Sequence, residues 1–340
     1  MLDRLTITEA RFNSMVEGVF EIAAAKDIVG EQISSWDRPS GINIAQRRVP
    51  LGVVAVIYES RPNVTADAAA ICIRSGNAAF LRGGSEAIET NRAIALVLAN
   101  AARSQGILPG VVSFVDTPDR AAVNALLQLD SCIDVVIPRG GETLIRAVAE
   151  QSRIPVLKHY KGICHLYVDK DANLEDAVRV VQNAKVQRPG VCNAVETLLV
   201  HADIAAEYLP KLLSAIPEVE IRDAIAAKEL DWSSEYLDLI LSVRVVDSLE
   251  QAVEHINTYG SGHTDGILSR NQNALEEFSV RVDTAVVVCN ASTRFNDGAE
   301  FGKGAEIGIS TDKLHARGPV GAVELTTYKY IVTGSGSVRE

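Results

Sequence analysis

Several common functional signals are absent from this 340-residue sequence. It contains no CxxC pair, and its odd number of cysteines, five, argues against a disulfide framework or a structural zinc site. Its six histidines form no HExxH pair, so we expect no metal cofactor. No apolar run is long enough to span a membrane, and the start MLDRLTITEARF is unlike a signal peptide. These absences predict a cytoplasmic protein.

The charge balance narrows the possible partners. Lys and Arg number 33 against 44 Asp and Glu, and the net charge of −11 argues against nucleic acid or an anionic membrane as a partner. Hydrophobic residues make up 47% of the chain and charged residues 23%, as in ordinary globular proteins. A chain of this length is expected to form two domains and to need no covalent staple.

Strand and helix patterns alternate along most of the chain. The first series has apolar strands at 51–59, 78–82, 111–115 and 133–138. The second has strands at 163–169, 194–200, 240–246, 264–269 and 283–289. Such alternation with helices predicts an α/β fold with two domains, each built on a parallel sheet. Ligands of such sheets bind beyond the carboxyl ends of the strands.

Two further strand patterns lie outside both series, at 42–49 and 324–332. If these segments pair, they form a protruding arm. An arm with unpaired edges usually meets another subunit. We therefore expect a homo-oligomer.

No GxGxxG fingerprint is present, so a dinucleotide would have to be held by main-chain N–H groups at helix starts. Two strand-to-helix turns suit that role, because each combines a cation, two glycines and a helix start: Arg82, Gly83, Gly84, Ser85 and Glu86 in one, and Pro138, Arg139, Gly140 and Gly141 in the other. Ordinary turns explain the same residues equally well, and the pattern alone leaves both interpretations open.

Cys192 is the sharpest local signal for catalysis. It follows Pro189-Gly190, between a helix and a buried strand, with Lys185 and Arg188 close in sequence. A thiolate in a cationic setting is an effective nucleophile, although the local sequence alone favours a small buried hydrophobe. We expect the other cysteines to lie in the core.

The glycine-rich stretch 290–322 has little hydrophobic periodicity, and long irregular loops are usually functional. It contains Asn290, Arg294, His315 and Arg317, a set able to hold an anionic substrate because arginine forks bind carboxylates and phosphates. A solvated loop is the alternative, and the pattern does not choose between the two.

One combined pattern runs in order along nearly the whole chain: VPLGVVAVIYESRPNVT (49–65), FLRGGSE (80–86), VIPRGG (136–141), KHYKGICHLYVD (158–169), QRPGVCNAVETLLV (187–200), AVEHINTYGSGHTDGI (252–267), NASTRF (290–295) and STDKLHARGPVG (310–321). This combination resembles the γ-glutamyl phosphate reductases, a branch of the aldehyde dehydrogenase superfamily. The resemblance implies an aldehyde dehydrogenase-like α/β fold with two parallel-sheet domains and a small β oligomerisation arm.

The resemblance also implies a division of the chain. Residues 1–160 would form an NADPH-binding domain, with 39–50 contributing to the arm. Residues 161–318 would form the catalytic domain that carries Cys192. Residues 319–340 would supply the strand that completes the arm.

The reaction implied by the resemblance is the NADPH-dependent reduction of L-glutamyl 5-phosphate to L-glutamate 5-semialdehyde and phosphate, the second step of proline biosynthesis. Cys192 would be the nucleophile that forms a thioester, and its main-chain N–H with Asn63 would stabilise the oxyanion. Glutamate 5-kinase, the source of the labile acyl phosphate, is an implied partner.

The remaining implied roles concern binding. The cofactor's ribose and phosphate would lie at Arg82–Glu86, its pyrophosphate at Pro138–Gly141 and its nicotinamide ribose at Glu235. The substrate would be bound by a mainly cationic set: Arg61, Asn290, Arg294, His315 and Arg317.

Hydrolytic aldehyde dehydrogenases carry a glutamate base in the segment that matches 158–162, which here reads Lys-His-Tyr-Lys-Gly. The missing carboxylate favours phosphate chemistry over hydrolysis. The alternatives are a hydrolytic NAD(P)-dependent aldehyde dehydrogenase and a cysteine hydrolase built on Cys192, His315 and Asn290. A further alternative is a truncated, weakly active or inactive member, because relatives carry helices ahead of the point that is here Met1.

Overall fold

The computed structural model describes residues 6–59, 61–223 and 226–339. The chain divides into two compact units: unit 1 is Met1–Lys158, Gly302–Gly308 and Pro319–Glu340, and unit 2 is His159–Phe301 and Ile309–Gly318. The expected catalytic domain ran without a break from 161 to 318, but Gly302–Gly308 belongs to unit 1. That segment is tied to unit 1 by Lys303, whose ammonium contacts Glu324 at 2.6 Å.

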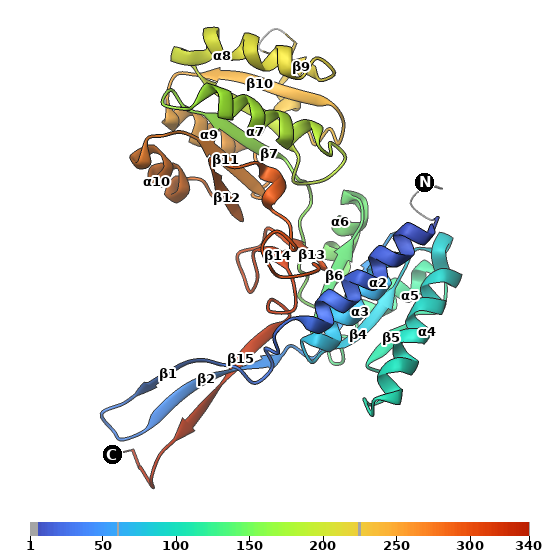
Figure 1. The fold of residues 1–340 in the computed structure, drawn as a ribbon. Helices are drawn as coiled ribbons and strands as arrows, with labels where there is room; N and C mark the ends of the chain where they lie inside the picture. Colours follow the sequence, from blue (N-terminus) through green and yellow to red (C-terminus); the bar gives the residue numbers. More distant parts are fainter. Residues whose placement is uncertain (1–5, 60, 224–225, 340) are drawn as a thin grey trace. The chain divides into compact units, whose positions relative to one another are not determined.

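Unit 1 is built on a four-stranded parallel sheet in the order β5-β4-β3-β6 (Figure 1). Its strands are β3 (Val53–Tyr58), β4 (Ala78–Arg82), β5 (Val112–Phe114) and β6 (Val135–Arg139). Its helices are α2 (Glu9–Ala24), α3 (Pro62–Arg74), α4 (Ile88–Ser104), α5 (Arg120–Leu126) and α6 (Glu142–Gln151), with the 3-10 turn η1 (Ser85–Ala87). The strand order reverses between β3 and β6, and their carboxyl ends therefore border the expected ligand crevice.

The boundaries of α3 follow from its terminal residues. The helix begins at Pro62, because proline suits the first helical turn, where its missing N–H has no partner to lose. It ends at Arg74, with Ser75 as its C-cap, and Gly76 follows in the left-handed region (φ +77°). The helix start therefore lies close behind the end of β3.

A three-stranded antiparallel sheet forms the arm of unit 1, in the order β1-β2-β15 (Figure 1). Its strands are β1 (Gln32–Asp37), β2 (Asn43–Pro50) and β15 (Thr326–Thr333). The expected pairing of the two outlying segments is confirmed, with Asn43 opposite Thr333 and Pro50 opposite Thr326. The sequence analysis missed β1, whose polar, mostly exposed residues lack a strand-like apolar pattern.

Unit 2 is built on a six-stranded parallel sheet in the order β12-β11-β7-β8-β10-β9. Its strands are β7 (Cys164–Val168), β8 (Val195–His201), β9 (Glu220–Arg222), β10 (Ile240–Val246), β11 (Thr264–Leu268) and β12 (Val286–Cys289). Its helices are α7 (Leu174–Val186), α8 (Ala202–Ala215), α9 (Leu249–Tyr259) and α10 (Gln272–Arg281), with the 3-10 turn η2 (Glu229–Ser233). Apolar clusters on both faces of the sheet bury β7 and β8 completely, which explains their continuous apolar sequences.

The glycine-rich stretch is less irregular than expected. It contains the 3-10 turn η3 (Thr293–Phe295) and two short paired strands, β13 (Gly308–Ser310) and β14 (Gly318–Val320).

The prediction that all cysteines other than Cys192 lie in the core is wrong for two of them. Cys132, in the turn before β6, and Cys289, at the end of the edge strand β12, are exposed.

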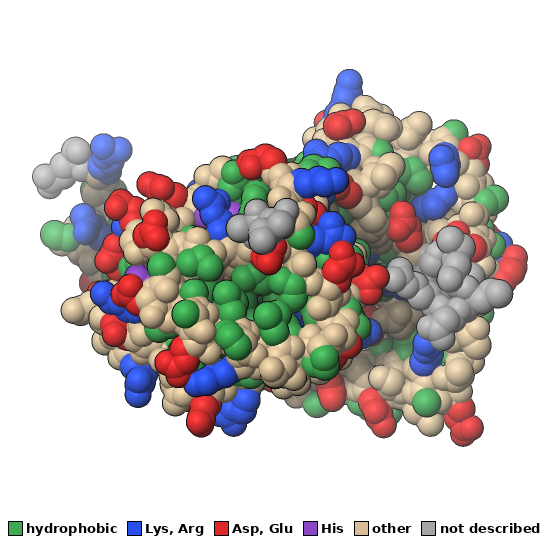
Figure 2. Space-filling view, turned by 90° about the horizontal axis from the view of Figure 1, so that it is seen from above, with side chains coloured by type: hydrophobic (Ala, Val, Ile, Leu, Met, Phe, Trp, Pro, Cys, Tyr) green, Lys and Arg blue, Asp and Glu red, His purple; other side chains and the backbone are tan. Residues whose placement is uncertain are grey.

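Among the described residues, no helix has the length and apolar content needed to cross a membrane. On the face shown in Figure 2, Lys and Arg side chains are interspersed with Asp and Glu.

Candidate active site

A cluster of nucleophilic and basic side chains in unit 2 lies where three neighbouring strands begin. His159 stands just before β7, Cys192 just before β8 and His263 directly before β11, and these strands are adjacent in the order β11-β7-β8. Neighbouring parallel strands start at the same edge of a sheet, which brings the three residues together. The sequence analysis expected ligand sites at carboxyl ends, but this cluster lies at the amino ends.

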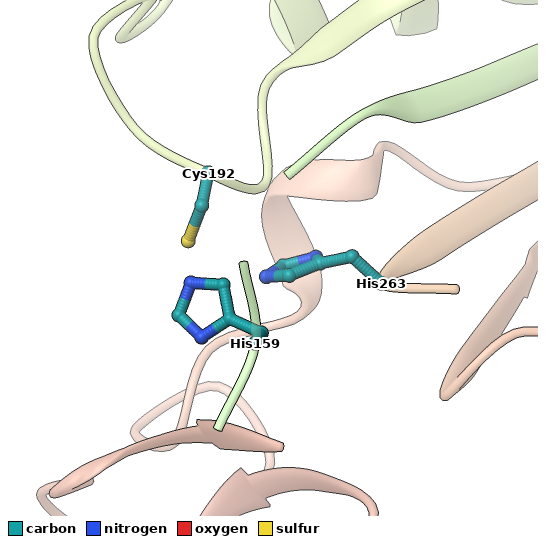
Figure 3. A group of neighbouring side chains, drawn as sticks. All are labelled: His159, Cys192 and His263. Atoms are coloured by element: carbon teal, nitrogen blue, oxygen red, sulfur yellow. The ribbon is translucent and has the colours of Figure 1, made fainter. Parts of the chain in front are cut away.

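The three side chains point toward one another (Figure 3). One imidazole nitrogen of each histidine and the Cys192 sulfur all lie within 4.8 Å of one another. Because His159 Nδ1 lies 3.0 Å from the carbonyl oxygen of Ile309, its Nε2 is the nitrogen that faces the sulfur. His263 is fully buried, with Nδ1 2.8 Å from Thr264 Oγ1. Cys192 and His159 are half-buried, so the cluster has a closed side and an accessible side.

The main chain of Cys192 is held by the segment that leads into β7. Cys164 Sγ donates a hydrogen bond to the Cys192 carbonyl oxygen at 3.1 Å. A Cβ atom on Gly162 would lie 2.0 Å from that same oxygen, so only glycine allows this close approach. The Gly162 N–H in turn donates to Glu235 Oε1 at 2.9 Å, which gives Glu235 a structural contact beside Cys192.

Replacing Gly162 with alanine is expected to displace Cys192 and lower kcat about 100-fold, because misplacing a nucleophile by about 1 Å has that effect. Steady-state kinetics checks this result. Gly190→Ala is the matched control on the other side of the contact, since among the described residues its Cβ would meet only Leu237 O, at 3.7 Å. Equal effects of the two substitutions would show that the close approach at Gly162 has no part in positioning Cys192.

A buried ion pair anchors both ends of the Cys192 loop. Lys185, at the end of α7, contacts Glu196 Oε2 in β8 at 2.6 Å, and neither side chain is exposed to solvent. The other Glu196 oxygen accepts the Leu237 N–H at 3.2 Å. Burial raises the pKa of Glu196 to about 7 and lowers that of Lys185. Lys185 therefore acts on the loop through Glu196 and is not a free cation beside the thiol.

Two of the expected substrate-binding arginines lie near the cluster. Arg294 is half-buried, interacts electrostatically with Cys192, and donates from Nε to Gln187 Oε1 at 2.8 Å. Burial is the main cause that lowers the pKa of Arg294, and the charge of Arg188 adds to it. Arg317 donates from Nη2 to Asp283 Oδ1 at 2.9 Å, and the same nitrogen would lie 3.8 Å from a Cβ on Gly262, the residue before His263.

The structure does not bring Asn290 to Cys192. Asn290 follows β12, and its amide accepts from the Ser269 N–H at 2.9 Å and donates to the Ser269 carbonyl oxygen at 2.8 Å, at the carboxyl edge of the sheet. His315 is an exposed residue in the left-handed region (φ +72°). The alternative of a cysteine hydrolase built on Cys192, His315 and Asn290 therefore lacks Asn290 beside the thiol.

Unit 1 contains a separate cavity of about 670 Å³ at the carboxyl ends of β3 and β4, bordered by α5 and α6. Its lining includes Arg82, Gly84, Ser85 and Glu86 of the first expected cofactor turn, together with Arg120. Arg82 is 8% exposed, and its buried Nε has no hydrogen-bond partner among the described residues. The other two guanidinium nitrogens of Arg82 donate to the carbonyl oxygens of Gly83 at 3.0 Å and Pro118 at 3.1 Å. A cavity of this volume with two arginines in its lining suits an anionic ligand of dinucleotide size.

Two glycines of these turns lie in close packing. A Cβ on Gly83 would lie 2.1 Å from Asn91 Nδ2, and one on Gly140 would lie 2.6 Å from the Glu59 carboxylate carbon. The Gly141 N–H, at the start of α6, donates to Glu59 Oε2 at 3.0 Å. A carboxylate thus binds the helix start where the resemblance places a pyrophosphate, and Pro138 and Arg139 end the strand that leads into it.

Two further predicted residues also belong to unit 1. Asn63 is exposed in the first turn of α3 and donates to Asp67 Oδ2 at 3.2 Å. Burial raises the pKa of Asp67 to about 6. Arg61 is exposed at the N-cap position of the same helix.

The sequence analysis missed His159 and His263 as site residues. Neither histidine has a short, motif-like spacing to another histidine. His159 and His263 come close to Cys192 only because their strands are neighbours in the sheet. A usable signal existed, because each of the three residues stands just ahead of a buried strand.

Comparisons with known proteins agree with this fold. The aldehyde dehydrogenase family model matches residues 6–234. The γ-glutamyl phosphate reductase of Moorella thermoacetica is 53% identical, covering 100% of this chain and 84% of the relative, and that of Persephonella marina is 50% identical, covering 100% and 81%.

Solved structures give the same result. The crystal structure of γ-glutamyl phosphate reductase from Thermotoga maritima has a TM-score of 0.97 at 45% identity, covering 99% of this chain and 84% of that one. An acetylating aldehyde dehydrogenase from Geobacillus thermoglucosidasius has a TM-score of 0.71 at 18% identity, covering 99% and 94%, and shares the fold. The expected aldehyde dehydrogenase-like fold is confirmed.

Proposed function

Because the chain belongs to the γ-glutamyl phosphate reductases of the aldehyde dehydrogenase family, we propose that Cys192 is the nucleophile of its reaction. That reaction is the reduction of L-glutamyl 5-phosphate to L-glutamate 5-semialdehyde, a step of proline biosynthesis. One observation carries the assignment: Cys192 is a half-buried thiol whose sulfur lies within 4.8 Å of a nitrogen of each of two histidines, where three strands begin.

Apart from Asn63, the groups proposed for the thioester step belong to unit 2. His159 Nδ1–H donates to Ile309 O, so Nε2 is left as the acceptor for the thiol proton of Cys192. The thiolate attacks the acyl carbon, a C–S bond forms, the C–O bond to phosphate breaks, and phosphate leaves with the electron pair. Arg294 provides positive charge for the substrate's phosphate, and Arg317 for its carboxylate. The Cys192 main-chain N–H and, by resemblance, Asn63 donate to the oxyanion.

The same residues disfavour hydrolysis of the thioester. Gly162, which lies against the Cys192 main chain, ends the segment 158–162. This segment reads Lys-His-Tyr-Lys-Gly, with no carboxylate to draw a proton from water. When bound, the nicotinamide nucleotide supplies the hydride that reduces the thioester, after which the aldehyde leaves and Cys192 is again a thiolate. Phosphate, rather than water, is therefore the co-substrate of the reverse reaction.

The cavity of unit 1 is the proposed cofactor site. Arg82–Glu86 would hold the ribose and its phosphate, Pro138–Gly141 the pyrophosphate, and Glu235 of unit 2 stays a candidate for the nicotinamide ribose by resemblance. Two cations, Arg82 and Arg120, line the cavity, and each lies within the other's electrostatic field. Arginine at this place in an α/β fold suits the 2′-phosphate of NADPH, which NADH lacks. We therefore propose NADPH as the cofactor.

Replacing Arg120 with alanine is expected to lower kcat/KM for NADPH about tenfold, because one charge-assisted contact to the 2′-phosphate is lost. The value for NADH should change less than about twofold, since NADH has no such phosphate. Arg120 is exposed at the first turn of α5, which makes a folding defect unexpected. If kcat/KM falls equally for NADPH and NADH, the assignment of this cavity to the 2′-phosphate is contradicted.

The arm is the proposed assembly surface. Its exposed face carries large apolar side chains, among them Trp36, Tyr330 and Val332, and Val332 is 60% exposed. Light scattering should show a dimer or larger assembly, and Val332→Asp should shift it toward monomer. Val280→Asp is the matched control, because Val280 is 80% exposed on α10. A monomeric wild-type protein would contradict the proposal.

Glutamate 5-kinase, which makes the labile substrate, remains the proposed partner.

Alkylation tests the nucleophile. Iodoacetamide should modify Cys192, and the loss of activity should follow the labelling of the Cys192 peptide rather than that of exposed Cys132 or Cys289. The semialdehyde substrate with NADP⁺ should slow the labelling. Full activity in protein whose Cys192 is alkylated would rule out the thioester mechanism.

A further inference from the structure

The donor atoms around Cys192 fit a metal ion as well as a substrate. His159, Cys192 and His263 offer two imidazole nitrogens and one sulfur, all within 4.8 Å of one another (Figure 3). We propose that this cluster is a reversible inhibitory site for Zn²⁺, which binds Cys192 in competition with the substrate. Only the inhibitory consequence rests on the proposed function, since metal binding itself requires no reaction.

The chemistry of the donors favours zinc over harder cations. Zinc prefers thiolate and imidazole ligands, whereas Mg²⁺ and Ca²⁺ prefer oxygen, and this group contains no carboxylate. Zn–N bonds of about 2.0 Å and Zn–S bonds of about 2.3 Å place tetrahedral donors roughly 3.5 Å apart. The present 4.8 Å spread therefore needs only a small inward movement of the side chains.

The two histidines are already oriented for this role. A histidine that binds zinc commonly uses its other ring nitrogen to hold a carbonyl or similar group, which fixes the ring. His159 Nδ1 lies 3.0 Å from the carbonyl oxygen of Ile309, and His263 Nδ1 lies 2.8 Å from Thr264 Oγ1. In both residues Nε2 is thereby the nitrogen directed at the cluster (Figure 3).

Burial also matches a three-ligand site with one open position. His263 is fully buried and forms the closed side of the cluster. His159 and Cys192 are half-buried and can be reached from solvent. Three protein ligands and one exchangeable water are typical of accessible zinc sites. The positive charge of Arg294, which interacts electrostatically with Cys192, opposes a cation. We therefore expect reversible rather than permanent occupancy.

Binding would proceed without any redox change. Two Zn–N bonds and one Zn–S bond form, the thiol proton of Cys192 passes to solvent, and zinc gives up bound waters. With its lone pair in the Zn–S bond, the sulfur can no longer attack the acyl phosphate. A chelator that removes zinc restores the free thiol.

The test uses Co²⁺ and Zn²⁺ on the purified full chain without substrate. Co²⁺ should give a thiolate-to-metal charge-transfer band and the visible bands of four-coordinate cobalt, and Zn²⁺ should displace it. His159→Gln should weaken Zn²⁺ binding at least about tenfold, as losses around zinc sites do, and Cys192→Ser should remove the charge-transfer band. Cys132→Ser and Cys289→Ser, which alter exposed thiols, are the controls.

His263→Gln removes a buried side chain, so His159→Gln, at a half-buried position, is the decisive variant. In wild-type protein the zinc affinity from Co²⁺ displacement should match the zinc concentration that halves activity, and EDTA should restore the rate. A charge-transfer band that persists in Cys192→Ser, or equal Zn²⁺ affinity in wild type and His159→Gln, would overturn the proposal. Because cobalt spectra need no turnover, these results stay separate from a failure of the reductase assignment.

Discussion

Serine in place of Cys192 is expected to lower kcat at least about 10⁴-fold, as the loss of a nucleophile does in other covalent enzymes. A serine hydroxyl keeps its proton near neutral pH and attacks an acyl phosphate poorly. NADPH affinity should stay within about twofold of the wild-type value, because the proposed cofactor cavity lies in unit 1 and Cys192 in unit 2. Stopped-flow absorbance and fluorescence titration measure the two quantities.

Cys132→Ser is the matched control, since it makes the same chemical change at an exposed turn. It should retain full activity. A Cys192→Ser variant that keeps more than about a tenth of the wild-type rate would contradict the thioester, because a serine hydroxyl without its own base attacks an acyl phosphate poorly.

Lys185→Met is expected to lower the free energy of unfolding of unit 2 by about 3–5 kcal/mol, because it leaves the Glu196 carboxylate buried without its partner. For a unit of this size the corresponding fall in Tm is on the order of 10 °C. Calorimetry should show the change in one transition if the two units unfold separately. The activity of Lys185→Met should fall together with its stability, since the ion pair of Lys185 and Glu196 joins α7 to β8 on either side of Cys192.

The double variant Lys185→Met with Glu196→Gln should recover most of the lost stability. The glutamine keeps an oxygen that accepts the Leu237 N–H, and no charge remains buried. Lys211→Met removes half of an exposed pair with Glu207 of the same 2.6 Å length and should cost less than about 1 kcal/mol. If Lys185→Met and Lys211→Met lower the free energy of unfolding equally, burial does not govern how much an ion pair stabilises this protein.

The sequence predicted the regular elements well because burial imposes its pattern locally. The apolar run at 51–59 became β3, and the strand AAFLR became β4 with the same limits, since both are covered by helices. Cys192 was found because its loop combines a cysteine, a turn and a following strand. These signals lie within a few residues of one another.

The arrangement around Cys192 could not be predicted in the same way. Which strands lie next to one another is set by long-range packing, and only the order β11-β7-β8 brings His159 and His263 to Cys192. The same limit explains Asn290, which shares a loop sequence with Arg294 but bonds to Ser269 at the opposite edge of the sheet. Short polar segments such as β1 carry too little apolar pattern to be recognised.

Phosphate dependence of the reverse reaction tests the central claim most directly. Purified protein would receive L-glutamate 5-semialdehyde and NADP⁺, with and without inorganic phosphate, while the absorbance of reduced cofactor is followed. If Cys192 forms a thioester that phosphate resolves, NADPH should accumulate continuously only when phosphate is present, with at most one equivalent per active site in its absence. Continuous formation at the same rate without phosphate would show that water resolves the thioester, and the enzyme would then be a hydrolytic dehydrogenase.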